Sequence, residues 1–269
     1  AIIRFIVMRN KLTIPDTIEV SLSAADLDGG LTDQKGLWLG RYTLDELQDD
    51  FEKFGILPHL KERGYTQVTP HLECEPFKGT LRITGQAHGR EHLLVEVTTR
   101  RTTESVIGDL DGKPYSTLVI DWVRFQDPCA EFEDGFPQLP GQEHPGLHLL
   151  EKGTALMVDH VKNLDVDLVL TYPQHFHNAV FYSPRFQFLD PQTQGHFQAL
   201  SRDLLSEGMA EASLALEEGR VSDENGRPVY WLSKAQVYPL SKKIYAELFD
   251  REYDMLVARA ARTRFKYTP

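Results

Sequence analysis

The sequence predicts a single α/β domain in which helices flank a mixed central β-sheet, with extra helices at the C-terminal end. Three observations support this fold class. Residues 67–101 consist of β-type segments separated by small polar breaks, which is typical of an antiparallel meander. Residues 116–172 contain a strand, a loop, an amphipathic helix and a second strand, the order of a β–α–β unit. From residue 192 onward, helical periodicity dominates.

The first predicted helix covers residues 43–64. Thr43 and Glu46 form a capping box at its start, and apolar residues follow at helical spacing. Gly55 and Pro58 interrupt this helix and Gly64 ends it, because glycine and proline are poor helix formers. The meander follows as three strands, at residues 67–75, 80–89 and 91–101.

The centre of the chain contains the predicted β–α–β unit. Its first strand is YSTLVIDWVRF, residues 115–125, whose β-branched and aromatic residues suit a buried position. Residues 126–146 are rich in Pro and Gly and predict a long loop. The amphipathic helix then covers residues 147–164, and VDLVLTY, residues 166–172, predicts a buried strand.

The remaining elements are a short helix around residues 175–182, a strand at 186–190, a long helix at 192–218, a strand at 229–233 and helices to the C-terminus. No linker composition separates these elements, so one domain is expected over residues 1–269. The apolar stripes of the C-terminal helices must be buried, either on the core or against a second subunit of a homodimer.

Composition excludes several functional classes. Twenty-nine basic residues against forty acidic ones give a net charge of −11, so a nucleic-acid partner is not expected. The two cysteines, Cys74 and Cys129, form no CxxC pair, which favours a reducing, cytoplasmic location without a disulfide framework. The N-terminal apolar run AIIRFIV is far shorter than the ~20 residues that span a bilayer, so no membrane anchor is expected. Met8 could be the natural start, in which case residues 1–7 are not native.

Two motifs resemble those of the GNAT acyltransferase superfamily, as does the order of the predicted elements over about residues 36–190. QEHPGLHLLEKGTALM, residues 142–157, is similar to the family's Q/R-x-x-G-x-G/A turn, in which backbone amides at a helix N-terminus receive the pyrophosphate of coenzyme A. The resemblance implies that residues 142 and 146–148 bind acetyl-CoA or another acyl-CoA. These residues are Gln142, Gly146, Leu147 and His148, with His148 at the second small position of the motif. Residues 191–269 would then elaborate the family core.

The second motif is HFHNAVFYSPRFQF, residues 175–188, which resembles the family's N-x-x-A-x-x-x-Y stretch with Tyr182 at the tyrosine position. The resemblance implies that Tyr182 protonates the leaving thiolate while an amine attacks the thioester. The acceptor would be a small-molecule or peptide amine. A general base must lie within hydrogen-bond reach of that amine, and Glu96 and Asp121, on neighbouring predicted strands, are the candidates.

Three other functions stay open from the sequence. A scaffold of this fold could have lost coenzyme A binding, because a bulky His148 replaces a small residue, and could act as a non-catalytic binding or assembly protein. The pairs His144 with His148 and His175 with His177 could ligate a metal. Cys129, in the long loop, could act as a nucleophile with a histidine base.

Overall fold

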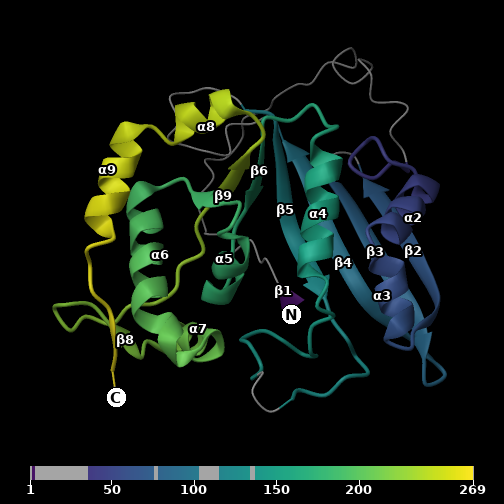
Figure 1. Ribbon diagram of the computed structural model, residues 1–269, viewed down its shortest axis with the longest axis horizontal. Coiled ribbons are helices and arrows are strands. Elements are labelled where there is room, and N and C mark those ends of the chain that lie inside the picture. Colours follow the sequence, from purple (N-terminus) through teal and green to yellow (C-terminus); the bar gives the residue numbers. More distant parts are fainter. Residues whose placement is uncertain (1, 4–35, 76–77, 103–114, 134–136, 269) are drawn as a thin grey trace, which may run out of the picture.

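The computed structural model describes residues 2–3, 36–75, 78–102, 115–133 and 137–268, and a mixed β-sheet lies at its centre (Figure 1). The strands of this sheet are β1 (Ile2–Ile3), β2 (Thr66–Glu75), β3 (Lys78–Ala87), β4 (Arg90–Thr102), β5 (Thr117–Phe125), β6 (Leu168–Thr171), β7 (Gln187–Phe188) and β9 (Gln236–Pro239). Their order is β2-β3-β4-β5-β6-β9-β7, and β1 pairs with β5. The β5–β6 pair is parallel and the other pairs are antiparallel. The predicted α/β class with a mixed sheet is confirmed.

The helices lie on both faces of this sheet. They are α2 (Leu44–Lys53), α3 (Ile56–Glu62), α4 (Leu150–Val161), α5 (Phe176–Tyr182), α6 (Pro191–Leu204), α7 (Met209–Glu218), α8 (Lys242–Leu248) and α9 (Arg251–Ala260). Figure 1 shows α2, α3 and α4 in front of strands β2 to β5. The side chain of Ile120 on β5 packs into the core on this face, whereas its neighbour Val119 packs into a second core with α8 and α9. Strand β5 is therefore buried on both faces, as its apolar run predicts.

The start of the helical layer agrees with the sequence. Thr43 and Glu46 form the predicted capping box, in which the Thr43 amide donates to a Glu46 carboxylate oxygen at 2.8 Å. Gly55 has a φ of 70° and separates α2 from α3, a left-handed conformation that glycine adopts without steric cost. The predicted interruption at Gly55 is therefore a complete break between two helices, whereas Pro58 lies within the first turn of α3 and does not interrupt it.

Strands β5 and β6 part after four residue pairs. They pair from Thr117 with Leu168 to Ile120 with Thr171. On the other side of β5, Thr98 of β4 pairs with Trp122 and Thr99 pairs with Ile120, so Asp121 is the extra residue of a β-bulge. A bulge bends its strand and increases the local twist. Strand β5 continues to Phe125 beyond the paired region, and β1 pairs with it at residues 123–124.

The C-terminal part differs from the prediction in two places. The helix expected over residues 192–218 is divided into α6 and α7, because Gly208 between them has φ 98° and ψ 153°. The strand expected at residues 229–233 is absent from the described residues, which form neither helix nor strand there. The Val229 amide donates to Val221 in the small strand β8 (Val221–Ser222), and the Trp231 amide donates to Leu216 in α7. The backbone of residues 229–231 therefore donates hydrogen bonds to two different elements and does not pair with a single neighbouring strand.

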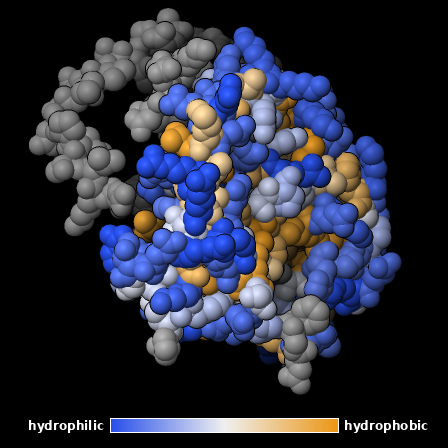
Figure 2. Space-filling model, turned by 60° about the vertical axis from the view of Figure 1, so that its left-hand side comes forward, coloured by the Kyte–Doolittle hydropathy of each residue, from blue (hydrophilic) through white to orange (hydrophobic). Residues whose placement is uncertain are grey.

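The outer surface over the C-terminal helices is mainly hydrophilic. Figure 2 turns this side forward and shows hydrophobic residues within a hollow, surrounded by hydrophilic ones. Helix α9 buries Tyr253 and Val257, whereas 58% of Met255 is exposed. Strand β8 pairs with the C-terminal strand β10 (Lys266–Tyr267) in a separate two-stranded sheet. Within the described residues, no helix is long and apolar enough to span a membrane.

Helices α6 and α9 pack closely at Gly195, which provides a test of this interface. A Cβ added at Gly195 would lie 2.5 Å from both the Cβ of Ala260 and the carbonyl oxygen of Val257. Overpacking costs about 1–3 kcal/mol, and contacts as short as 2.5 Å place this substitution in the upper part of that range, at about 2–3 kcal/mol. The higher helix propensity of Ala offsets about 1 kcal/mol of this cost. We therefore expect Gly195→Ala to lower the free energy of unfolding by about 1–2 kcal/mol in a urea titration. Gln198→Ala, at an exposed position of the same helix, is the control. A Gly195→Ala variant as stable as the wild type would show that the helices are not this close.

Candidate functional site

A small apolar cavity lies where β5 and β6 part. Its volume is about 70 Å³, and residues from six structural elements and the segment after α5 line it. The lining residues are Val97 of β4, Ile120, Val123 and Phe125 of β5, Val169 of β6, Tyr238 of β9, Leu150, Gly153, Thr154, Met157, Val158 and Val161 of α4, Tyr182 of α5, and Phe186. The cavity joins the first turn of α4 to Tyr182, the predicted acid, whereas none of the four residues predicted to bind acyl-CoA lines it.

Tyr182 provides a phenol group to this cavity. It is the last residue of α5, and its ring contacts Phe186 edge-on with 5.5 Å between ring centroids. The hydroxyl oxygen is buried, and burial raises the pKa of Tyr182 well above its usual range. The phenol is therefore protonated throughout the physiological pH range. A group in this state can donate a proton but cannot serve as a base.

The loop before α4 contributes no residue to the cavity lining and ends at the helix N-terminus, next to the lining residue Leu150. Helix α4 begins at Leu150, three residues later than predicted. The N-cap residue is Leu149, whose apolar side chain cannot accept hydrogen bonds from the first backbone amides of the helix. Among the described residues, no acceptor pairs with the backbone amides of residues 146–152. Unpaired amides at a helix N-terminus carry partial positive charge and attract anions.

Contacts with neighbouring elements hold this loop in place. The Gln142 side chain is buried and its Oε1 accepts a hydrogen bond from the Leu139 amide at 2.8 Å. The Asp127 amide donates to the Pro145 carbonyl at 2.8 Å, and the His59 ring lies 2.7 Å from the Leu147 carbonyl. The Leu147 side chain is fully buried, so only its backbone could contact a ligand. Gln142 therefore positions the loop, and its side chain faces the loop backbone.

His148 has a backbone conformation that favours glycine. Its φ is 56°, in the left-handed region, while its side chain is exposed. Burial of part of the ring, followed by the charge of Arg63, lowers the pKa of His148. The small residue of the family motif would therefore suit this backbone, and the imidazole extends outward from it.

The two base candidates lie on the other face of the sheet. Residues alternate faces along a strand, so Glu96 lies opposite to the cavity-lining Val97. Glu96 accepts a hydrogen bond from Arg82 Nε at 2.9 Å. Arg100 Nε lies 3.0 Å from both carboxylate oxygens of Asp121. Burial raises the pKa of Asp121, and the charge and hydrogen bond of Arg100 oppose this shift.

The position of Asp121 distinguishes it from Glu96. Asp121 is the bulge residue that directly follows Ile120, the last residue of β5 that pairs with β6. It therefore lies where the two strands part, whereas Glu96 lies within a continuous ladder of β3, β4 and β5. Neither carboxylate lines the cavity around Tyr182.

The predicted histidine pairs are arranged differently from a metal site. The rings of His175 and His177 stack in parallel, with centroids 5.2 Å apart. His175 Nδ1 pairs with the Glu217 carboxylate, and His177 Nδ1 lies 2.9 Å from Ser213 Oγ. No group of three His, Cys, Asp or Glu side chains that could hold a metal occurs within the described residues. These histidines form a polar contact between α5 and α7.

Cys129 has a neighbour that sequence reasoning missed. Its sulfur lies 3.7 Å from His92 Nε2, and the Cys129 amide donates to Asp127 Oδ1 at 3.3 Å. The same carboxylate accepts a hydrogen bond from Tyr65 Oη at 2.5 Å. His92 and Cys129 lie 37 positions apart, so no local pattern could have paired them.

Gly153 and Thr154 are cavity residues that motif analysis also missed. A Cβ at Gly153 would lie 2.8 Å from the ring of Phe125, so a glycine at this position lets α4 approach β5. The periodicity of the helix predicts which residues of α4 face the core, but it does not predict that the first turn faces a gap between strands. Comparison with known proteins adds no assignment: no protein-family model matches the chain, and no curated protein matches it in sequence.

Proposed function

We propose that this protein is an acyl-CoA-dependent N-acyltransferase of the GNAT type, most simply an N-acetyltransferase, acting on a small-molecule or peptide amine. One observation carries the proposal: a single apolar cavity joins a protonated, buried phenol to the first turn of a helix whose N-terminal amides have no partner among the described residues. An acyl thioester of coenzyme A has matching parts, because its pyrophosphate suits the amides and its acyl group suits the cavity.

The element order supports the same proposal. A helix pair, antiparallel strands, a long strand, a loop opening a helix, a parallel strand and a short helix follow one another, as the resemblance to the GNAT superfamily implies. The left-handed backbone at His148 also supports it, since the motif has a small residue there. The bulky side chain that motivates the alternative of a lost coenzyme site is exposed rather than directed into the loop.

Each residue has a distinct role in the proposed reaction. The bound cosubstrate would supply an activated carbonyl carbon for attack by the amine. The amides of residues 146–152 would hold its pyrophosphate, and the lining of the cavity would exclude water from the acyl group. Tyr182 would give its phenolic proton to the departing thiolate. Because the cavity already holds Tyr182 on the helix side, the amine would approach from the opposite face of the sheet.

Asp121 is the better placed of the two candidate bases. It lies at the divergence of β5 and β6, on the face from which the amine would approach, and Arg100 orients its carboxylate. A carboxylate there would also attract a cationic amine, in agreement with the net charge of −11. Glu96 lies within the continuous β3–β4–β5 ladder and pairs with Arg82, so we favour Asp121 over Glu96 as the base.

Ligand-induced stabilisation tests the coenzyme site. A ligand at a hundred times its Kd stabilises the folded state by about 2.7 kcal/mol. For a chain of this length, the thermal midpoint should rise by roughly 5–10 °C with coenzyme A or acetyl-CoA. Gly146→Val should reduce this shift, because a branched side chain hinders approach of a phosphate to the loop. His148→Gly should increase it, because it removes the bulky side chain from a left-handed position.

The controls separate the proposal from its alternatives. Ala130→Val, elsewhere in the same loop, should leave the shift unchanged. A shift without turnover of any amine would favour a non-catalytic binding protein of this fold. Absence of a shift at millimolar coenzyme A and acetyl-CoA would contradict the proposed site.

A further inference from the structure

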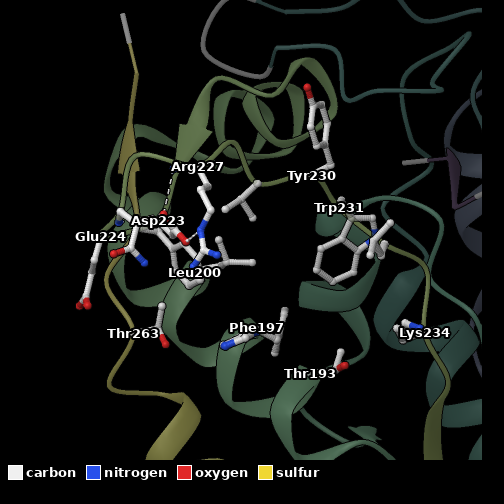
Figure 3. A pocket seen from close by; sticks show the side chains of 15 residues that line it. Thr193, Phe197, Leu200, Asp223, Glu224, Arg227, Tyr230, Trp231, Lys234 and Thr263 are labelled. Atoms are coloured by element: carbon white, nitrogen blue, oxygen red, sulfur yellow. Dashed lines mark hydrogen bonds and ion pairs between the residues drawn. The ribbon is translucent and has the colours of Figure 1, made fainter.

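A second, larger pocket shares no lining residue with the cavity at Tyr182. Its volume is about 440 Å³, and it lies between α6 and the extended segment at residues 228–234 (Figure 3). Helix α6 contributes residues at helical spacing, and the turn after β8 and residues 263–265 close one end. Its lining includes Phe197, Leu200, Glu224, Tyr230, Trp231 and Lys234.

An aromatic cluster forms a fixed wall of this pocket. The ring of Trp231 contacts Phe176, Phe188 and Phe197, with centroid separations of 5.4, 6.0 and 6.4 Å. Its indole N–H donates to the Pro173 carbonyl at 3.0 Å. The ring is therefore held in place, and only its apolar surface is available to a ligand. Phe197 and Leu200 continue this apolar wall along α6.

The rim of the pocket exposes large hydrophobic side chains. Tyr230 is 56% exposed and Leu232 is 66% exposed, and both line the pocket. In Figure 3, Tyr230 extends beyond the pocket with its hydroxyl pointing away from Trp231. Exposed hydrophobic side chains that cluster in this way commonly mark a binding site. The volume lies within the usual range of about 300–1,000 Å³ for small-molecule sites.

Some charged side chains that line the pocket have hydrogen-bond or ion-pair partners among the described residues, and one does not. Asp223 pairs with Arg227 at 2.9 Å, and Glu224 accepts a hydrogen bond from the Arg264 amide at 3.2 Å. Lys234 forms no hydrogen bond or ion pair with any described residue. Figure 3 shows Lys234 on the side of the pocket opposite to Asp223 and Glu224, beyond the Trp231 ring. The pocket therefore combines a flat apolar wall with a lysine at its end that no described residue pairs with.

We propose that this pocket binds a small aromatic carboxylate, with its ring against Trp231, Phe197 and Leu200 and its carboxylate on Lys234. A charge-assisted hydrogen bond from an ammonium group to a carboxylate is stronger than one between neutral groups. The aromatic ring would cover apolar surface that is otherwise exposed at the rim. This inference is independent of the proposed acyl transfer, because the two pockets share no residue.

Calorimetric titration of the full chain with three probes tests the inference. The probes are 2-naphthoate, its neutral analogue 2-naphthamide, and octanoate as an aliphatic acid. We expect 2-naphthoate to bind about tenfold more tightly than 2-naphthamide, the ratio that a charge-assisted contact at a partly exposed site supports. It should also bind more tightly than octanoate. Lys234→Gln should remove the preference for the acid over the amide, and Leu232→Ser at the rim should weaken both aromatic probes.

A matched control is available on α8. Lys243 is 84% exposed and lies 4.0 Å from Glu247, outside the pocket, so Lys243→Gln should keep the tenfold preference. Saturating acetyl-CoA should leave naphthoate binding unchanged. Absence of naphthoate binding at millimolar concentration would overturn the inference, as would an acid preference that survives Lys234→Gln. Octanoate binding as tight as naphthoate would refute the aromatic part, and competition with acetyl-CoA would place the probe at the other cavity.

Discussion

Replacing Tyr182 by Phe is expected to lower the rate constant for acyl transfer by about 100-fold or more, the usual effect of removing a general acid. The substitution deletes one hydroxyl oxygen and leaves the ring, so its contact with Phe186 and the shape of the cavity are retained. Because the amides before α4 would bind the coenzyme, the Kd of acetyl-CoA should change little. An effect on kcat without an effect on binding is characteristic of a group that acts in the transition state.

Tyr238→Phe is the matched control for this experiment. Tyr238 lines the same cavity from β9, so its substitution removes a hydroxyl group from the same surroundings. We expect its effect on kcat to be much smaller. The pH profile adds a second test: because burial raises the pKa of Tyr182, the rate should not fall between pH 7 and 9 through loss of its proton. If Tyr182→Phe retains the wild-type rate, its assignment as the acid is wrong.

Acidification is expected to destabilise the protein through His177. This side chain is fully buried in α5, and burial followed by the neighbouring His175 lowers the pKa of His177 to about 3. In the unfolded chain its pKa is about 6.5. Between these values the unfolded chain binds a proton that the folded chain excludes, so the free energy of unfolding falls as the pH decreases below about 6.5. The loss is about 1.4 kcal/mol per pH unit, or about 3 kcal/mol at pH 4.5.

Comparison with a His177→Gln variant isolates this contribution. The ionisable groups near the ring, His175 and its partner Glu217, are present in both proteins. Ser213, which lies 2.9 Å from His177 Nδ1, does not titrate in this range and can bond to an amide side chain. Urea titrations at pH 7, 5.5 and 4.5 should show a steeper loss of stability for the wild type. Parallel curves for the two proteins would show that His177 is not the cause.

Local structure was largely predictable from the sequence. The capping box of Thr43 and Glu46 and the break at Gly55 depend on neighbouring residues only, and both are found in the structure. The β-type segments before α4 correspond to strands β2 to β5, because alternation and β-branched runs are strong signals over ten residues. The single helix expected over residues 192–218 was wrong at Gly208, where one residue with positive φ outweighs the periodicity on either side.

The candidate site was predictable only in part. The motif resemblance identified Tyr182 and the loop before α4, and the structure brings Tyr182 and the first turn of α4 to one cavity. It did not separate Asp121 from Glu96, because both are acidic residues on neighbouring strands. The β-bulge at Asp121 distinguishes them, and a bulge depends on the register between β4 and β5.

The sequence by itself determined the class of the fold, the order of most elements and the face of each element that is buried. These properties follow from periodicity and from the backbone preferences of single residues. The tertiary structure decided which faces meet: Tyr182 with α4, His92 with Cys129, and Trp231 with α6. Such contacts join residues far apart in the chain, and they arise from strand register and long-range packing. A local pattern states which side of an element is apolar, but it carries no information about the partner that covers it.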